Sequence, residues 1–227
     1  MNCYNCGREL TAATNHVEHI PAKNIFATYP PEYKQQLVTV PACFDCNNDF
    51  SKIDQEIRDA IGIMNDNNDL QNEMTRKSVK SIMRKSNWVN RVVSTDDGKA
   101  FEVSFSYDNF KKLHVKNFKG LFYHKYGFPL PKEYEVEIIA EGDEEHERLQ
   151  NIAKFLYGYT DEGIEWNTVG HEDVFQYKIK AMIADKNGMI FDDVNIEHAI
   201  GFVCIMHYLH AIKPLIIASR TDFIDGE

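Results

Sequence analysis

Two pairs of cysteines near the start of the chain have the spacing of metal ligands. Cys3 and Cys6 form one Cys-x-x-Cys pair and Cys43 and Cys46 form a second, which together use four of the five cysteines. Four thiolates supply the tetrahedral set that zinc prefers, and such a closed set leaves no coordination position for a substrate. We therefore expect a structural zinc ion here and the chemistry elsewhere. Redox-active or incidental thiols are the alternative.

Glu18 and His19 lie between the two cysteine pairs and are the first candidates for chemistry. If the segment is extended, neighbouring side chains point to opposite faces, so the carboxylate can face a metal ion while the imidazole faces a water. Carboxylate oxygens suit Mg²⁺ or Mn²⁺, and a neutral histidine suits a general base near pH 7. Asn47 directly follows Cys46, where its amide oxygen can be a second metal ligand. The simpler alternatives are a surface histidine at position 19 and a turn residue at position 47.

These residues, in this order, resemble the HNH endonuclease family, which has a ββα-metal fold. The resemblance covers about a quarter of the chain and follows the zinc-containing branch, on the motifs Cys3-x-x-Cys6, Glu18-His19-Ile20-Pro21 and Val40-Pro41-x-Cys43-x-x-Cys46-Asn47. It implies that His19 is the general base and that Glu18 and Asn47 bind a catalytic Mg²⁺ or Mn²⁺. The implied activity is hydrolysis of phosphodiester bonds in DNA. Its implied context is phage defence, restriction or a mobile element.

Two positions depart from the family pattern. The acidic position, Glu18, is more often aspartate, so a metal ion would sit further from the backbone. Val38 stands where many members have an asparagine that orients the base, so another group must orient His19. A competing hypothesis is a non-catalytic zinc-binding module that docks nucleic acid or a protein partner. A third is a toxin or phage-defence effector that acts on invading DNA or on RNA.

Basic side chains concentrate in the middle of a chain whose net charge is −10. Residues 61–120 contain 11 Lys and Arg against 7 Asp and Glu, whereas residues 121–227 contain 9 against 20. We expect the middle segment to contact a phosphate backbone; the solvated face of a helix is the alternative. The predicted contacts are Lys23, Arg76, Lys77, Lys80, Arg84 and Lys85. The acidic C-terminal part is expected to bind a protein partner or to form a homo-oligomer.

Local patterns predict an α+β protein with three parts: a zinc-stapled ββα-metal module over residues 1–64, a basic helical connector over 65–92 and a mixed α+β accessory domain over 93–227. Helices are expected at 51–64, 73–92, 108–126 and 144–157, with the polar stretch 65–72 breaking the first. Strands are expected at 37–40, 101–105, 134–140, 175–183 and 202–209, and a short final strand after Pro214 runs through Ile217. Gly127 should end the helix at 108–126, and several lysines of this helix should face solvent.

Nothing in the sequence predicts insertion into a membrane or export. The chain has no run of 18 apolar residues, and its start lacks the basic and apolar regions of a signal peptide. We therefore expect a cytoplasmic protein with reduced thiols. Cys204 lies in an apolar run and is expected in the core. His16 is expected to be a histidine of a solvated loop. Asp49, Asp54 and Glu56 are expected to interact favourably with a helix N-terminus and to have no catalytic role.

Overall fold

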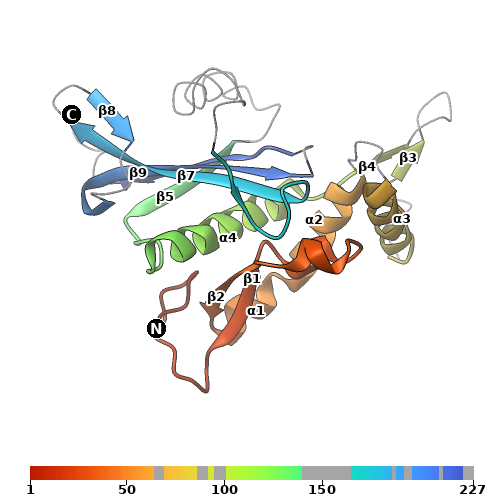
Figure 1. The fold of residues 1–227 in the computed structure, drawn as a ribbon, viewed down its shortest axis with the longest axis horizontal. Coiled ribbons are helices and arrows are strands. Elements are labelled where there is room, and N and C mark those ends of the chain that lie inside the picture. Colours follow the sequence, from red (N-terminus) through yellow and green to blue (C-terminus); the bar gives the residue numbers. More distant parts are fainter. Residues whose placement is uncertain are drawn as a thin grey trace.

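A computed structural model describes residues 1–63, 69–85, 92–94, 101–139, 165–185, 188–191, 196–209 and 212–221. It has the mixed α+β fold that the sequence predicts, with a small hairpin, a larger sheet and a long helix between them (Figure 1). Within these ranges, no helix has the length and apolar character needed to cross a membrane. The predicted helix at 144–157 lies outside the described residues.

A two-stranded hairpin forms the N-terminal part of the fold. Strand β1 (His16–Ile20) pairs antiparallel with β2 (Val38–Ala42), and two 3₁₀ helices, η1 (Lys23–Phe26) and η2 (Pro31–Lys34), lie between them in the chain. Helix α1 (Phe44–Asp49) follows β2, and α2 (Ser51–Ile63) follows α1. Helix α2 begins at Ser51 as predicted, and its apolar stripe buries Ile57 and Ile61.

Helix α3 (Asp69–Met83) packs against α2 and differs from its predicted bounds. It begins inside the stretch that was expected to break the helix, and it ends nine residues before position 92. Apolar residues mark its inward face, because Met74 and Ile82 are buried. Beyond it, β3 (Val92–Ser94) pairs antiparallel with β4 (Phe101–Val103).

The C-terminal part is an antiparallel sheet in the order β5-β10-β9-β7-β6, with β8 also paired to β7. Its strands are β5 (Tyr134–Ile139), β6 (Asn167–Thr168), β7 (Phe175–Asp185), β8 (Gly188–Phe191), β9 (Ala199–Tyr208) and β10 (Leu215–Arg220), with the 3₁₀ helix η5 (Ile196–His198) before β9. The strict alternation of apolar residues predicted β7, and the continuous apolar run predicted β9. Cys204 lies fully buried in β9, as expected.

Helix α4 (Tyr107–Tyr126) lies between the sheet and the hairpin (Figure 1). Ser106 caps its start by accepting a hydrogen bond from the Asn109 amide, and Gly127 ends it in a left-handed conformation with φ of 82°. Inside the helix, a Cβ on Gly120 would lie 2.4 Å from Ile20 Cγ1. Only glycine therefore lets α4 come this close to β1.

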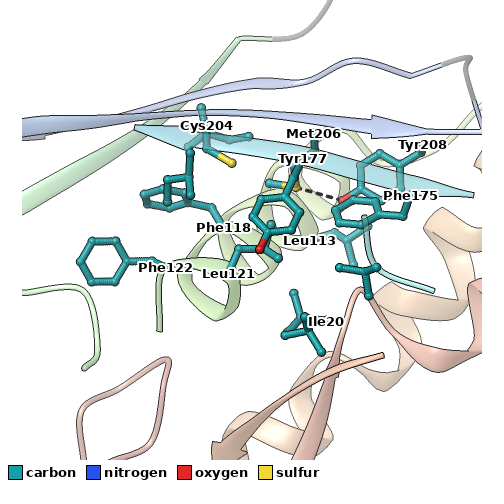
Figure 2. Packing of buried hydrophobic residues seen from close by; sticks show 14 of the residues in the cluster. Ile20, Leu113, Phe118, Leu121, Phe122, Phe175, Tyr177, Cys204, Met206 and Tyr208 are labelled. Carbon is teal, nitrogen blue, oxygen red and sulfur yellow. Dashed lines mark hydrogen bonds between the residues drawn. The ribbon is translucent and has the colours of Figure 1, made fainter. Parts of the chain in front are cut away.

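One hydrophobic core joins the hairpin, α4 and the sheet. Figure 2 shows Phe118, Leu121 and Phe122 of α4 between the sheet residues above and Ile20 of β1 below. Phe202 of β9 belongs to the same cluster and meets the Phe122 ring edge-on, at 4.8 Å between centroids. The position of β1 is therefore fixed by burial against α4 as well as by pairing with β2.

Candidate functional site

The four paired cysteines meet in one cluster, as their spacing predicts. Their sulfur atoms all lie within 4.8 Å of one another, and Cys6 Sγ is 3.9 Å from Cys43 Sγ. With Zn–S distances of about 2.3 Å, tetrahedral sulfur ligands are about 3.8 Å apart, so the spacing fits this ion. Asn5 also donates a hydrogen bond to Cys46 Sγ over 3.4 Å. The cluster can hold a metal ion such as zinc.

Backbone amides around Cys3 favour the thiolate form of this residue, which is the form that binds metal. Burial raises the pKa of the Cys3 thiol, but hydrogen bonds from the amides of Cys6, Cys43 and Asn5 outweigh it and bring the pKa to about 7. The turn that presents the Asn5 and Cys6 amides closes with a hydrogen bond of 3.0 Å from the Gly7 amide to the Cys3 carbonyl. Gly7 has a φ of 73°, a conformation that glycine adopts readily.

Glu18 and His19 lie on opposite sides of β1, as an extended segment predicts. In the register with β2, Glu18 is opposite Val40 and His19 is opposite Thr39. Glu18 is buried at 7% exposure, whereas His19 is half-buried. Burial, and then the charge of Lys23, lower the pKa of His19 below its usual value. The imidazole is therefore neutral at neutral pH, the form that accepts a proton.

Lys116 of α4 reaches the Glu18 carboxylate and also that of Asp54 on α2. Its ammonium nitrogen lies 3.0 Å from Glu18 Oε1 and 2.9 and 2.7 Å from Asp54 Oδ1 and Oδ2. The Lys116 side chain is 0% exposed, and those of Glu18 and Asp54 are 8% and 10% exposed. Burial raises the pKa of both carboxyl groups, while the Lys116 charge opposes that rise. Two buried carboxylates thus share one cation.

Lys116 is a buried lysine in a helix for which the sequence predicts several solvent-facing lysines. It lies three residues after Leu113 and four before Gly120, so it falls on the buried stripe of α4. Asp54 was explained by its place near a helix N-terminus, but its side chain binds Lys116 instead. Helical spacing could have placed Lys116 inside. The partner that neutralises it comes from another element, which no local pattern reveals.

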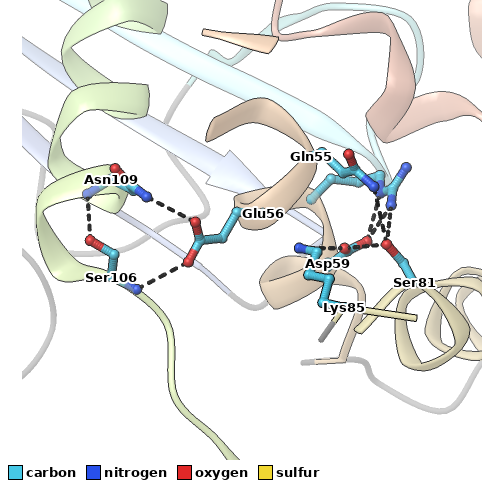
Figure 3. A network of polar contacts seen from close by, with 8 residues as sticks. Gln55, Glu56, Asp59, Ser81, Lys85, Ser106 and Asn109 are labelled. Atoms are coloured by element: carbon cyan, nitrogen blue, oxygen red, sulfur yellow. Dashed lines mark hydrogen bonds and ion pairs between the residues drawn. The ribbon is translucent and has the colours of Figure 1, made fainter. Parts of the chain in front are cut away.

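The other predicted residues have different surroundings. Asn47 lies within α1 rather than in a turn and is half-buried. Its backbone amide donates a hydrogen bond to the Cys43 carbonyl over 3.0 Å. The His16 ring packs edge-on against the Phe44 ring, with centroids 5.7 Å apart. Glu56 accepts hydrogen bonds from the Ser106 amide and from Asn109 Nδ2, so it anchors the start of α4 (Figure 3). Lys23 and Asp49 are exposed.

Five of the six basic residues predicted to bind nucleic acid line one cavity between α2 and α3, and Lys23 does not. The cavity has a volume of about 600 Å³ and contains six cationic side chains but only one carboxylate, that of Glu73. Its lining is Gln55, Arg58, Glu73, Arg76, Lys77, Lys80, Ser81, Arg84 and Lys85. Five of these are the predicted Arg76, Lys77, Lys80, Arg84 and Lys85, which the fold brings together. The sixth cation, Arg58, had no predicted role.

Asp59 is fully buried beside this cavity and organises part of its lining (Figure 3). It accepts hydrogen bonds from Arg58 Nε over 3.0 Å and from Ser81 Oγ over 2.6 Å, and Lys85 Nζ lies 3.5 Å from its Oδ2. These contacts tie α2 to α3. Arg76, in contrast, forms an exposed pair with Glu73.

Helix α2 connects the shared-cation site to the basic cavity. Asp54 binds Lys116, and Arg58, one helical turn later, lines the basic cavity. A second cavity of about 10 Å³ is lined by both Asp54 and Arg58, together with Asn117 and Tyr208. A carboxylate site and a basic cavity therefore lie next to each other along one helix.

The chain was compared with protein-family models, with curated proteins and with solved structures. None of the three comparisons gives a match. The functional argument therefore depends on the geometry of the residues described above.

Proposed function

We propose that this protein is a metal-dependent endonuclease of HNH type that hydrolyses phosphodiester bonds in nucleic acid, with DNA as its first substrate. The observation that carries the proposal is the position of Asp54 and Arg58 on α2. They place a buried carboxylate pair one helical turn from a cavity with six cations. A phosphodiester hydrolase needs both features, because its substrate is an anion and its transition state gains negative charge.

The donor groups in β1 and α2 fit a hard divalent cation. Glu18 and Asp54 already converge on one cation, the Lys116 ammonium, and carboxylate oxygens are the ligands that Mg²⁺ and Mn²⁺ prefer. In the proposed site Glu18 and Asn47 hold the ion. When bound, such an ion would stabilise the charge that develops on the phosphate and the departing oxygen.

The protein's own groups would supply binding and proton transfer. Lys77, Lys80 and Arg84 line the cavity and form no ion pair with a described residue, so their charges remain for phosphate oxygens. His19, on the more exposed side of β1 and neutral at pH 7, would accept the proton of the attacking water. The cysteine cluster would fix Asn47 through the α1 backbone.

The experiment that tests this proposal is cleavage of supercoiled plasmid, linear duplex and single strands with Mn²⁺, with Mg²⁺ and with EDTA. His19→Ala should lower the rate by about 100- to 10,000-fold while zinc content is unchanged, because a general base contributes that much. The matched control is His124→Ala, an exposed histidine of α4. Cleavage by His19→Ala at the wild-type rate would sink the assignment of the base.

One observation favours the second candidate, a non-catalytic module that docks nucleic acid or a protein partner. Lys116 neutralises the carboxylate that the endonuclease needs as a metal ligand. In that case Glu18→Ala would leave Mn²⁺ binding and nucleic-acid binding unchanged. The acidic residues 121–227, with 20 Asp and Glu against 9 Lys and Arg, would then bind a basic protein partner or a second copy of the chain.

A further inference from the structure

The basic cavity between α2 and α3 has one anchored cation in its wall. The Arg58 side chain is 10% exposed, and the fully buried Asp59 accepts hydrogen bonds from its Nε and Nη2. Nη2 also lies 3.4 Å from Ser81 Oγ, so Asp59 and Ser81, which meet from α2 and α3 in Figure 3, hold one edge of the guanidinium. No described residue is hydrogen-bonded to Arg58 Nη1. An arginine fixed in this way can bind a ligand with little further loss of side-chain freedom.

Every described residue that lines the cavity is charged or polar. Small-molecule sites of about 300–1,000 Å³ are mostly apolar, with a few polar groups, so this lining does not suit a ligand with a large apolar body. The described lining residues include no aromatic ring on which a nucleic-acid base could stack. The two uncharged side chains, Gln55 and Ser81, are hydrogen-bonded to each other over 3.3 Å. The lining therefore suits a ligand made of anionic oxygen groups.

Positive charge in the cavity exceeds what the described carboxylates neutralise. Six cationic side chains line it, and the carboxylates of Glu73 and Asp59 leave about four of these charges uncompensated. Arg76, Lys80 and Arg84 also follow one another at intervals of four residues, a spacing at which like charges repel each other along a helix. A triphosphate, with one charge on each phosphate and nearly a second on the terminal one, carries about four negative charges at pH 7. It would balance the cavity.

We infer that the cavity between α2 and α3 is a binding site for a free polyphosphate, either inorganic or the triphosphate of a nucleotide, and that this ligand competes there with the nucleic-acid backbone. The inference rests on the proposed function for the competing ligand and adds regulation to it. Arg58 would be the fixed contact, and Lys77, Lys80 and Arg84 would contact the remaining phosphate oxygens. These three side chains are also the proposed contacts to the backbone. Each ligand therefore lowers the apparent affinity for the other.

The test is calorimetric titration of inorganic triphosphate into the zinc-loaded full chain, without Mg²⁺, Mn²⁺ or nucleic acid. We expect one triphosphate per chain. Replacing Lys77, Lys80 and Arg84 with glutamine should lower the affinity by about 10- to 100-fold, since each charge contact at a partly exposed site contributes a factor of about 2 to 5. No saturable binding to the wild-type chain overturns the inference.

The control variant replaces three exposed lysines outside the described lining with glutamine, so that both variants lose three positive charges. These are Lys111, Lys112 and Lys132. Its triphosphate affinity should fall by less than about twofold, because salt screens separated exposed charges. Equal losses in the two variants would show a long-range effect of net charge and would contradict a discrete site.

A second arm compares ligands. Adenosine triphosphate should bind with about the affinity of inorganic triphosphate, because base stacking would add a factor of about 5 or more and the described lining offers no ring for it. A gain of that size for the nucleotide would contradict a site that recognises phosphates alone. Sulfate at the same ionic strength should not displace triphosphate, and equal displacement would show unspecific binding of anions.

A further readout uses the wild-type chain, so it does not depend on the folding of a variant. The Arg58 Nε–H is buried and hydrogen-bonded to Asp59 over 3.0 Å, so its ¹H–¹⁵N NMR signal should exchange slowly with water. Triphosphate should shift this signal and should displace a labelled DNA duplex over the same concentration range. Binding that changes neither the Arg58 signal nor the DNA affinity places triphosphate elsewhere and overturns the inference.

The outcomes also separate this inference from the proposed function. Triphosphate binding that is lost with Lys77, Lys80 and Arg84, without cleavage of any nucleic acid, supports the polyphosphate site and contradicts the endonuclease. Cleavage that requires His19, combined with no triphosphate binding, supports the endonuclease and contradicts the polyphosphate site.

Discussion

Replacing Asp59 with asparagine should cost about 3 kcal/mol of the free energy of unfolding. Asp59 is 0% exposed and is held by Arg58, whose side chain is 10% exposed, with Ser81 on its other oxygen (Figure 3). Removing one partner of a buried ion pair costs about 3–5 kcal/mol, because the other charge stays buried. Asparagine keeps one acceptor, so the lower end applies. Its amide group, however, must face a donor, either Arg58 or Ser81.

The assay is urea unfolding of Asp59→Asn beside Asp45→Asn. Asp45 makes the same kind of pair with Arg8, but both side chains are more than 60% exposed, so its loss should leave the unfolding midpoint unchanged. With a slope of about 3 kcal/mol per molar urea, Asp59→Asn should move the midpoint down by about 1 M. Hydrogen exchange in α3 should speed up, because Ser81 and Lys85 hold it to α2 through Asp59.

A double-mutant cycle with Arg58→Gln identifies the source of the loss. The double variant should be less destabilised than the sum of the two single variants, because removing Arg58 relieves the charge that Asp59→Asn leaves buried. Additive effects, or a loss below about 1 kcal/mol in Asp59→Asn, would show that packing of α2 on α3 holds the cavity wall without this network.

Three further predictions concern the cysteine cluster, the basic cavity and a buried histidine. Cys46→Ser should retain less than one zinc ion per chain by elemental analysis; full retention contradicts the four-sulfur site. Replacing Lys77, Lys80 and Arg84 with glutamine should weaken duplex DNA binding and make the slope of log affinity against log salt shallower by about 2–3. An unchanged slope would exclude this cavity as the surface that binds DNA. Burial lowers the pKa of His114 to about 3 from 6.5, so below pH 6.5 only the unfolded chain takes up that proton, and stability falls by about 1.4 kcal/mol per pH unit. His114→Gln should remove that part of the pH dependence of unfolding, and equal slopes in both proteins would contradict it.

Elements with a strong local signal could be predicted from the sequence. Gly127 ended α4 as expected, the alternating residues of β7 form a strand, and two Cys-x-x-Cys pairs meet in one cluster. Helix α1 could not be predicted, because it is six residues long and mostly polar. Cys46 within it and Cys43 at its N-cap contribute to the sulfur cluster, a contact made across the chain that outweighs weak helix propensity.

The candidate site, too, could be predicted from the sequence only in part. Glu18 and His19 point to opposite sides of β1 because a strand alternates, and this follows from sequence alone. The pairing of Glu18 with Asp54 and Lys116 does not, because it requires knowing which faces of β1, α2 and α4 meet. A lysine three residues after Leu113 and four before Gly120, on the buried side of a helix, is the one signal that could have indicated it.

Helix α4 completes a site whose motifs all lie before residue 64. Residues 1–63 contain both buried carboxylates but not Lys116, the cation that neutralises them, nor the apolar surface that covers Ile20. Gly120 brings α4 close enough for both contacts, since any side chain there would collide with Ile20. Because two unpaired carboxylates would be costly in the core, the hairpin and α2 depend on α4 for the geometry of Glu18. Helix α4 is thus a structural component of the candidate site, because it supplies the ammonium that pairs with both carboxylates.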